Sequence, residues 1–344
     1  MKRENRTNWL VAAAAGAVFA AATVWRNRRG SYNLEGRVVL ITGGSRGLGL
    51  VLARQAVAEG AKVAICARDA EELERARQEL AADGAQVIAL PLDLTDADAV
   101  RTLVAEVQQQ LGPIDVLVNN AGIITAGPLD NTELRDYEDS MDTHFWAPLH
   151  AMQAVLPTMR RRGEGRIVNI ASLGGKVAIP HLAPYCASKF ALVGLSEGFR
   201  AELVQHGIVV TTVCPGLLRT GSARHAIVKG QHKKEYSWFT IADSMPFWTL
   251  SAETAARQIW NACRRGDGEI ILSVPAKVLA AFHGLMPGAA TDILGWVNRS
   301  LPDASERGNE RRHGYESETP ITKSWLTALT RKAEKENNQL TSNK

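Results

Sequence analysis

Short apolar segments alternate with helical patterns along most of this 344-residue chain, and the alternation is the strongest constraint on its fold. The strand-like segments are 38–42, 62–67, 86–90, 116–119, 166–170, 209–213 and 269–273. The helical patterns between them are 50–59, 70–82, 97–111, 135–159, 184–206 and 252–265. Apolar strands joined by helices are typical of a parallel sheet buried on both faces. We expect a single domain with a Rossmann-type, doubly wound parallel sheet in three α/β/α layers.

The parts outside this α/β region differ from it in composition. Residues 1–29 carry six basic side chains against one acidic, so the remainder is close to neutral although the whole chain has a net charge of +4. A main domain without a basic excess argues against a nucleic-acid partner. We divide the chain into an apolar amino-terminal segment (1–29), the α/β domain (30–275), an apolar extension (276–301) and a polar tail (302–344).

Residues 9–25 form an uncharged run of 17 residues with Trp9 and Trp25 at its ends and basic residues on both sides. As a helix this run would be about 25 Å long, close to the ~30 Å hydrocarbon core of a bilayer. We favour a transmembrane anchor, because Trp is typical of the membrane interface. A cleaved export signal and a soluble or disordered leader remain as alternatives.

The sequence of the carboxyl-terminal parts does not point to a single structure or role. The apolar extension 276–301 could touch the membrane interface or cover the domain or a partner subunit. The tail 302–344 is polar with nearly balanced charge, which predicts loose structure with one weak helix near 325–336.

The four cysteines are Cys66, Cys186, Cys214 and Cys263. They form no CxxC pair, and no His cluster accompanies them. We therefore expect neither a metal site nor a disulfide framework, and we interpret the cysteines as small buried residues.

A glycine-rich loop, Thr-Gly-Gly-Ser-Arg-Gly-Leu-Gly, follows the first predicted strand and precedes the first helix. Gly43, Gly47 and Gly49 permit a tight turn and a close approach of the backbone to a ligand. The helix would present free N–H groups and the positive end of its dipole to an anion. In this βαβ context the loop, including Ser45 and Leu48, predicts a site for the pyrophosphate of a dinucleotide.

The end of the second predicted strand bears on the choice of dinucleotide. NAD-binding proteins usually have an acidic residue there to accept a hydrogen bond from the ribose 2′-hydroxyl. This chain has Ala67 followed by Arg68, and Arg46 and Ser45 lie on the nearby loop. Because a guanidinium can grip a 2′-phosphate, we expect NADP(H) rather than NAD(H). The alternative is that Arg46 and Arg68 are solvated surface residues.

With these motifs in place, the chain resembles the short-chain dehydrogenase/reductase family over about residues 36–275. The glycine loop matches the TGxxxGxG motif of that family, and Ser172, Tyr185 and Lys189 match its Ser…YxxxK catalytic set. The resemblance implies a hydride-transferring oxidoreductase that acts on CH–OH or C=O groups. It also implies cofactor contacts at Asp93, Leu94, Asn119, Asn120, Ala121, Gly122, Pro215, Gly216 and Thr220, together with Tyr185 and Lys189.

The catalytic set suits reduction of a carbonyl group, in which negative charge develops on oxygen. Tyr185 would protonate that oxygen, and Ser172 would donate a hydrogen bond to it. Lys189 lies one helical turn after Tyr185, so we expect its ammonium group to lower the pKa of the phenol. The resemblance implies that Lys189 also binds the ribose hydroxyls of the nicotinamide nucleotide.

One position departs from the family pattern. The family usually has an Asn in the helix before a Leu-Pro pair, and this Asn completes a proton relay through water to the Lys. Here the position falls on His144. A histidine can relay protons, so it could replace the Asn. It could equally be a core histidine with a satisfied backbone partner.

The segment after Thr220, where the family places its lid, contains Trp238, Phe239, Pro246, Phe247 and Trp248. Aromatic walls suit a lipophilic substrate, although these residues could simply pack the lid or a dimer interface. We expect NADPH-dependent reduction of a ketone or aldehyde on such a substrate, or the reverse oxidation. The alternative is a catalytically idle NADP-binding redox sensor or scaffold. Cytoplasmic NADPH would place a membrane-anchored catalytic domain on the cytoplasmic side, and a homodimer or homotetramer is possible.

Overall fold

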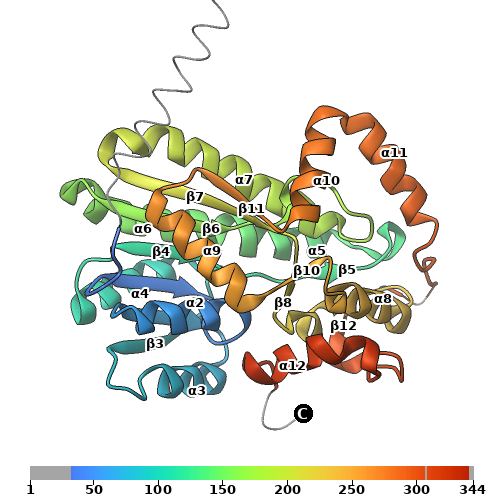
Figure 1. The fold of residues 1–344 in the computed structure, drawn as a ribbon, viewed down its shortest axis with the longest axis horizontal. Helices are drawn as coiled ribbons and strands as arrows, with labels where there is room; N and C mark the ends of the chain where they lie inside the picture. Colours follow the sequence, from blue (N-terminus) through green and yellow to red (C-terminus); the bar gives the residue numbers. More distant parts are fainter. Residues whose placement is uncertain (1–31, 307, 341–344) are drawn as a thin grey trace, which may run out of the picture.

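The computed structural model describes residues 32–306 and 308–340. Its centre is a seven-stranded sheet in which all neighbouring strands are parallel (Figure 1). In spatial order the strands are β11 (Glu269–Leu272), β7 (Ile208–Pro215), β6 (Gly165–Ile170), β4 (Val116–Asn119), β1 (Val38–Thr42), β2 (Lys62–Ala67) and β3 (Val87–Pro91). The order reverses between β1 and β4, which is where a doubly wound sheet opens its binding crevice. The predicted fold is confirmed.

Helices cover both faces of the sheet. One face packs against α2 (Gly47–Ala58), α3 (Ala70–Leu80) and α9 (Ala252–Arg265), and the other against α4 (Ala97–Leu111), α6 (Ala147–Arg162) and α7 (Ala183–Leu203). Successive strand residues point to opposite faces. Val39 and Leu40 of β1 therefore belong to different apolar cores although both are fully buried.

The helix expected over 135–159 is interrupted. α5 (Leu134–Met141) continues into α6 through a π-helical turn, Asp142–Trp146. The wider turn holds His144, which is buried and lines the cavity described below. A π turn adds only one residue to a helix, so apolar periodicity does not reveal it.

Short elements form a smaller lobe beyond the carboxyl ends of the strands. They are β5 (Thr125–Ala126), β8 (Leu217–Arg219), β9 (Ile227–Val228), α8 (His232–Ser244) and β10 (Thr249–Ser251). β8 pairs with β10, β9 pairs with β5, and α8 packs against β8 and β9. These pairings hold α8 over the edge of the sheet where a ligand would bind.

The apolar extension forms a helical hairpin, α10 (Val274–Leu285) and α11 (Pro287–Asn298), which stands away from the domain at the upper right of Figure 1. Its large apolar side chains, including Leu285 and Trp296, are mostly exposed. The hairpin therefore does not cover its own domain. None of the helices in the described residues is long and apolar enough to span a bilayer, and the predicted anchor lies outside those residues.

The expectation of a loosely structured tail is wrong for residues 302–306 and 308–340. β12 (Arg312–His313) pairs with β9, and α12 (Ala328–Glu336) forms where the weak helix was predicted and packs against α8. The Asn131 side chain also fixes this segment, because its Nδ2 donates to Ser305 O at 2.8 Å. The tail is ordered by partners distant in sequence, which composition does not indicate.

Candidate functional site

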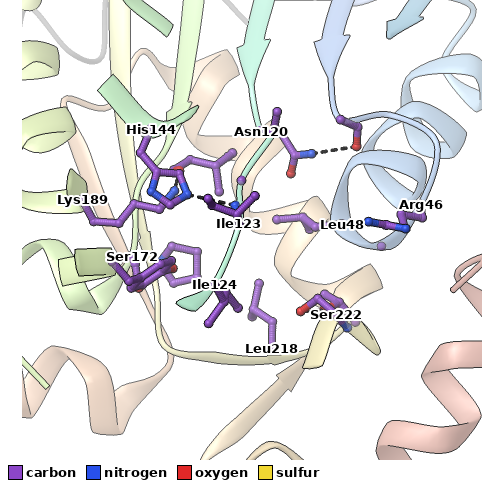
Figure 2. Close-up of a pocket in the computed structure, with 18 of the residues that line it drawn as sticks. Arg46, Leu48, Asn120, Ile123, Ile124, His144, Ser172, Lys189, Leu218 and Ser222 are labelled. Carbon is purple, nitrogen blue, oxygen red and sulfur yellow. Dashed lines mark hydrogen bonds between the residues drawn. The ribbon is translucent and has the colours of Figure 1, made fainter. Parts of the chain in front are cut away.

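A cavity of about 400 Å³ lies at the carboxyl edge of the sheet, across the switch point (Figure 2). Its walls come from the β1–α2 loop, the segment after β4, the start of α7, the segment after β7 and α8. The predicted site residues that line it are Gly43, Ser45, Arg46, Gly47, Leu48, Arg68, Asn120, Ala121, Gly122, Ser172, Tyr185, Lys189, Pro215, Gly216 and Thr220. The structure therefore brings the glycine loop and the Ser-Tyr-Lys set into one cavity.

The glycine loop is held in shape by the segment after β4. Asn120 Nδ2 donates to the carbonyl oxygen of Gly43 at 3.0 Å (Figure 2). It also donates to the carbonyl oxygen of Thr42, again at 3.0 Å. Gly43 and Gly47 have φ angles of +63° and +57°, which favour glycine. A Cβ on Gly49 would lie 2.1 Å from Gly43 O, so this glycine lets the loop pack on the helix.

Four of the predicted cofactor residues do not line the cavity, namely Gly49, Asp93, Leu94 and Asn119. Asn119 is buried and links two strands, because its Nδ2 donates to Asn169 Oδ1 at 2.7 Å. Asp93 accepts hydrogen bonds from the backbone and the hydroxyl of Thr95.

The end of the cavity near β2 contains a carboxylate that we did not predict. Glu72 of α3 is buried; its Oε1 accepts a hydrogen bond from Ser45 Oγ, and its Oε2 lies 2.9 Å from Arg46 Nη1. Arg46 is thus ion-paired rather than solvated. Arg68 also lines this end. Amphipathic spacing marks position 72 only as part of a helix, so the pairing could not be read from the sequence.

Ser172, Tyr185 and Lys189 meet at the opposite end of the cavity. Ser172 follows β6, and its Oγ accepts a hydrogen bond from Gly174 N–H at 3.0 Å. Tyr185 lies in the first turn of α7. Lys189, one turn on, donates from Nζ to Ile170 O at 2.8 Å, and Nζ lies 5.7 Å from the centroid of the Tyr185 ring.

The electrostatics of this set differ from our expectation. Burial raises the pKa of Tyr185 to about 12, and a hydrogen bond with Ser172 opposes that rise. Burial also lowers the pKa of Lys189 to about 7. The expectation that Lys189 lowers the pKa of the phenol is therefore wrong here, because desolvation dominates the pKa of both groups.

His144 is held on both sides of its ring. Nε2 accepts a hydrogen bond from Ile123 N–H at 3.1 Å (Figure 2). Nδ1 lies 2.8 Å from Ser188 Oγ. Burial, together with the charge of Lys189, lowers the pKa of His144 well below its usual value, so the ring is neutral and Nδ1 carries the proton. Both ring nitrogens of His144 form hydrogen bonds within the chain. His144 therefore fits the second of our two alternatives, a core histidine with a satisfied backbone partner.

Apolar side chains surround the catalytic end. Those that line the cavity include Ile123, Ile124, Leu173, Ile179, Leu182, Leu217, Leu218 and Phe239. Phe239 is the member of the predicted aromatic group that reaches the cavity, whereas Phe247 and Trp248 are exposed. Asp243 of α8 is buried in the same wall, and burial raises the pKa of its carboxyl group to about 7.

Replacing Asp243 with Asn should make the protein more stable at pH 8 but not at pH 5. The unfolded chain loses this proton near pH 3.8, whereas the folded chain keeps it up to about pH 7. The wild type therefore loses stability as pH rises between these values, by about 3 kcal/mol from pH 5 to pH 8, and the amide does not. Urea unfolding at both pH values measures the difference. Asp83→Asn, at an exposed position, is the control; a pH-independent effect of Asp243→Asn would contradict the assignment.

Comparison with known proteins is consistent with this geometry. A family model described as short chain dehydrogenase matches residues 37–229. A relative from Anopheles gambiae, "Dehydrogenase/reductase SDR family protein 7-like", is 39% identical over 297 residues, which cover 85% of this chain and 91% of the relative. A "Putative ketoacyl reductase" from Streptomyces coelicolor is 40% identical over 261 residues, which cover 74% of this chain and 92% of that relative.

Solved structures show the same fold. A short-chain dehydrogenase from Streptomyces avermitilis superposes with a TM-score of 0.66 at 31% identity, covering 77% of this chain and 98% of that one. A gluconate 5-dehydrogenase from Burkholderia cenocepacia, solved in complex with NADP and tartrate, superposes with a TM-score of 0.63 at 27% identity. The superposition covers 72% of this chain and 98% of that one.

Proposed function

Because this chain belongs to the short-chain dehydrogenase family of NAD(P)-binding oxidoreductases, we propose that it uses NADPH to reduce a ketone or aldehyde on a lipophilic substrate, or catalyses the reverse oxidation. The observation that carries the proposal is one cavity with the glycine loop at one end and Ser172, Tyr185 and Lys189 at the other. The apolar wall around the catalytic end supports a lipophilic substrate.

The residues present fit a dinucleotide. The Gly47 N–H donates to Asn337 O, and the rest of the first turn of α2 offers backbone N–H groups to a pyrophosphate. Arg68 would meet a phosphate on the adenosine ribose, because the Ser45 hydroxyl donates to Glu72. Gly122 leaves room at the other end, since a Cβ there would lie 3.1 Å from His144 Nε2 and 3.9 Å from Lys189 Nζ. When bound, a nicotinamide would supply or accept the hydride.

Tyr185 has the protonation state that reduction needs. A phenol with a pKa of about 12 is protonated at neutral pH and can give its proton from Oη to a carbonyl oxygen. Ser172 forms a hydrogen bond with the Tyr185 side chain. The Ser172 hydroxyl can also stabilise the carbonyl oxygen of the substrate as negative charge develops on that oxygen. Lys189, with its pKa lowered to about 7, can take or return a proton near neutral pH.

A series of methyl ketones of increasing chain length tests the substrate class. If the apolar wall binds the substrate body, kcat/KM measured by NADPH oxidation should rise about fourfold for each buried methylene. A flat series would exclude a lipophilic substrate. The absence of turnover with ketones, aldehydes and alcohols would refute the proposed function as a whole.

Arg68→Ala should raise KM for NADPH about tenfold or more and leave KM for NADH nearly unchanged. The reason is that a guanidinium contributes charge-assisted hydrogen bonds to a 2′-phosphate, which NADH lacks. Initial rates with each cofactor measure the effect, and Arg101→Ala, at a position 65% exposed on α4, is the control. If both cofactors lose affinity equally, Arg68 does not select NADP(H).

We also propose a membrane location, with the α/β domain on the cytoplasmic side. The uncharged run 9–25 and the exposed apolar side chains of the α10–α11 hairpin support it. Carbonate-washed membranes should retain the full-length chain and release one that starts at Gly30. Equal behaviour of the two would overturn this proposal.

A further inference from the structure

The carboxyl-terminal residues of the described chain lie on the glycine loop. After α12 ends at Glu336, Asn337 O accepts a hydrogen bond from Gly47 N–H at 2.9 Å. Asn338 Nδ2 donates to Ser45 O at 2.9 Å. The tail thus binds the first residue of α2, at the helix end that faces the cavity.

The same segment also binds the opposite wall of the cavity. Gln339 Nε2 donates to Thr220 O at 3.0 Å, and Gln339 O accepts a hydrogen bond from His225 Nε2, also at 3.0 Å. Thr220 follows β8, whereas Ser45 precedes α2. Residues 337–339 therefore bridge the glycine loop and the segment after β8, which also approach each other through Arg46 and His225.

Gln339 carries an unmatched acceptor at this point. Its side chain lines the cavity, the residue is 1% exposed, and Oε1 has no hydrogen-bond partner among the described residues. Exchanging the two ends of the amide would not help, because an oxygen would then face the carbonyl oxygen of Thr220. A buried acceptor of this kind needs a donor. A dinucleotide offers ribose hydroxyl donors, whereas its phosphate oxygens only accept.

We propose that Gln339 is a cofactor-binding residue whose Oε1 accepts a hydrogen bond from a ribose hydroxyl of the dinucleotide, directly or through one water. Residues 337–339 then form the strap that closes the cavity between the glycine loop and Thr220. Gly47 allows this arrangement, because a Cβ there would lie 2.9 Å from Gln339 Nε2. The inference rests on the proposed function in so far as it takes the ligand to be a dinucleotide.

Titration of the full-length protein with NADPH, followed by the fluorescence of the bound cofactor, tests the contact. Gln339→Ala should bind NADPH about tenfold more weakly than the wild type, because it loses the cofactor contact and the bridge to Thr220. Gln231→Ala is the matched control, since Gln231 Nε2 also donates to a distant backbone carbonyl, that of Asp303, at 3.0 Å but does not line the cavity. It should bind NADPH like the wild type.

Asn338→Gly tests the strap without touching the ligand. Asn338 has a φ of +54°, so glycine keeps the backbone and removes the amide that donates to Ser45 O and Glu72 O. We expect faster release of NADPH in stopped-flow dissociation, with the melting temperature of the free protein unchanged. If both variants bind and release NADPH like Gln231→Ala, the inference is overturned while the proposed function stands. A wild-type chain that binds neither NADPH nor NADH would overturn both.

Discussion

Tyr185→Phe is expected to lower kcat for carbonyl reduction by a factor of about 10²–10⁴, with little change in NADPH binding. The phenol is the group placed to give a proton to the carbonyl oxygen, and phenylalanine keeps the ring but has no proton to give. Initial rates of NADPH oxidation measure kcat, and fluorescence titration measures cofactor binding separately. A loss confined to kcat would assign Tyr185 to the chemical step rather than to folding.

Tyr315→Phe is the matched control for that experiment. Tyr315 stacks on His313 in the tail, with 5.2 Å between ring centroids, and does not line the cavity. It should retain wild-type kcat. If Tyr185→Phe also retains most of its activity, the proton comes from another group, and the Ser-Tyr-Lys assignment fails even though the geometry is present.

Local motifs made most of the site predictable. A strand, a glycine loop and a helix follow one another in the sequence, so the sequence alone places Gly43 and Gly47 at the carboxyl end of β1, where they line the cavity. Tyr185 and Lys189 are one helical turn apart, which fixes their common face. In each case the local geometry is set within a few residues, where backbone preferences act directly.

The missed features depend on contacts between segments far apart in the chain. Glu72 of α3 pairs with Arg46 of the β1–α2 loop, and Asn338 donates to Ser45 from the other end of the sequence. No local pattern encodes such a pairing. The pKa of Tyr185 was misjudged for a related reason: spacing shows that Lys189 is near, but only the packed structure shows how far both groups are desolvated.

The stability of the lobe beside the cavity should depend strongly on Lys229. This residue follows β9 and is 0% exposed, and its Nζ lies 2.7 Å from Asp136 Oδ2 and 2.9 Å from Glu133 Oε2. Asp136 is also buried and lies 3.2 Å from Arg311 of the tail. The cluster therefore joins α5, β9 and the tail through the buried charges of Lys229 and Asp136.

Lys229→Met is expected to lower the free energy of unfolding by about 3–5 kcal/mol. Methionine fills much of the same volume but leaves the Asp136 carboxylate with one cation fewer in a buried setting, and removing one partner of a buried pair has a cost of this size. Urea unfolding measures it. Lys332→Met, which removes a cation 70% exposed and paired with Glu336 on the surface, should cost less than about 1 kcal/mol.

A double variant separates the ion pair from the loss of packing. If the cost of Lys229→Met comes from the unpaired carboxylate, then Lys229→Met combined with Asp136→Asn should lose less stability than the sum of the two single losses. Strict additivity would mean that the side chain of Lys229 acts through its apolar stem alone. Because Arg311 approaches the same carboxylate, the single variants should also increase hydrogen exchange in β12, which connects this cluster to the tail that reaches the glycine loop.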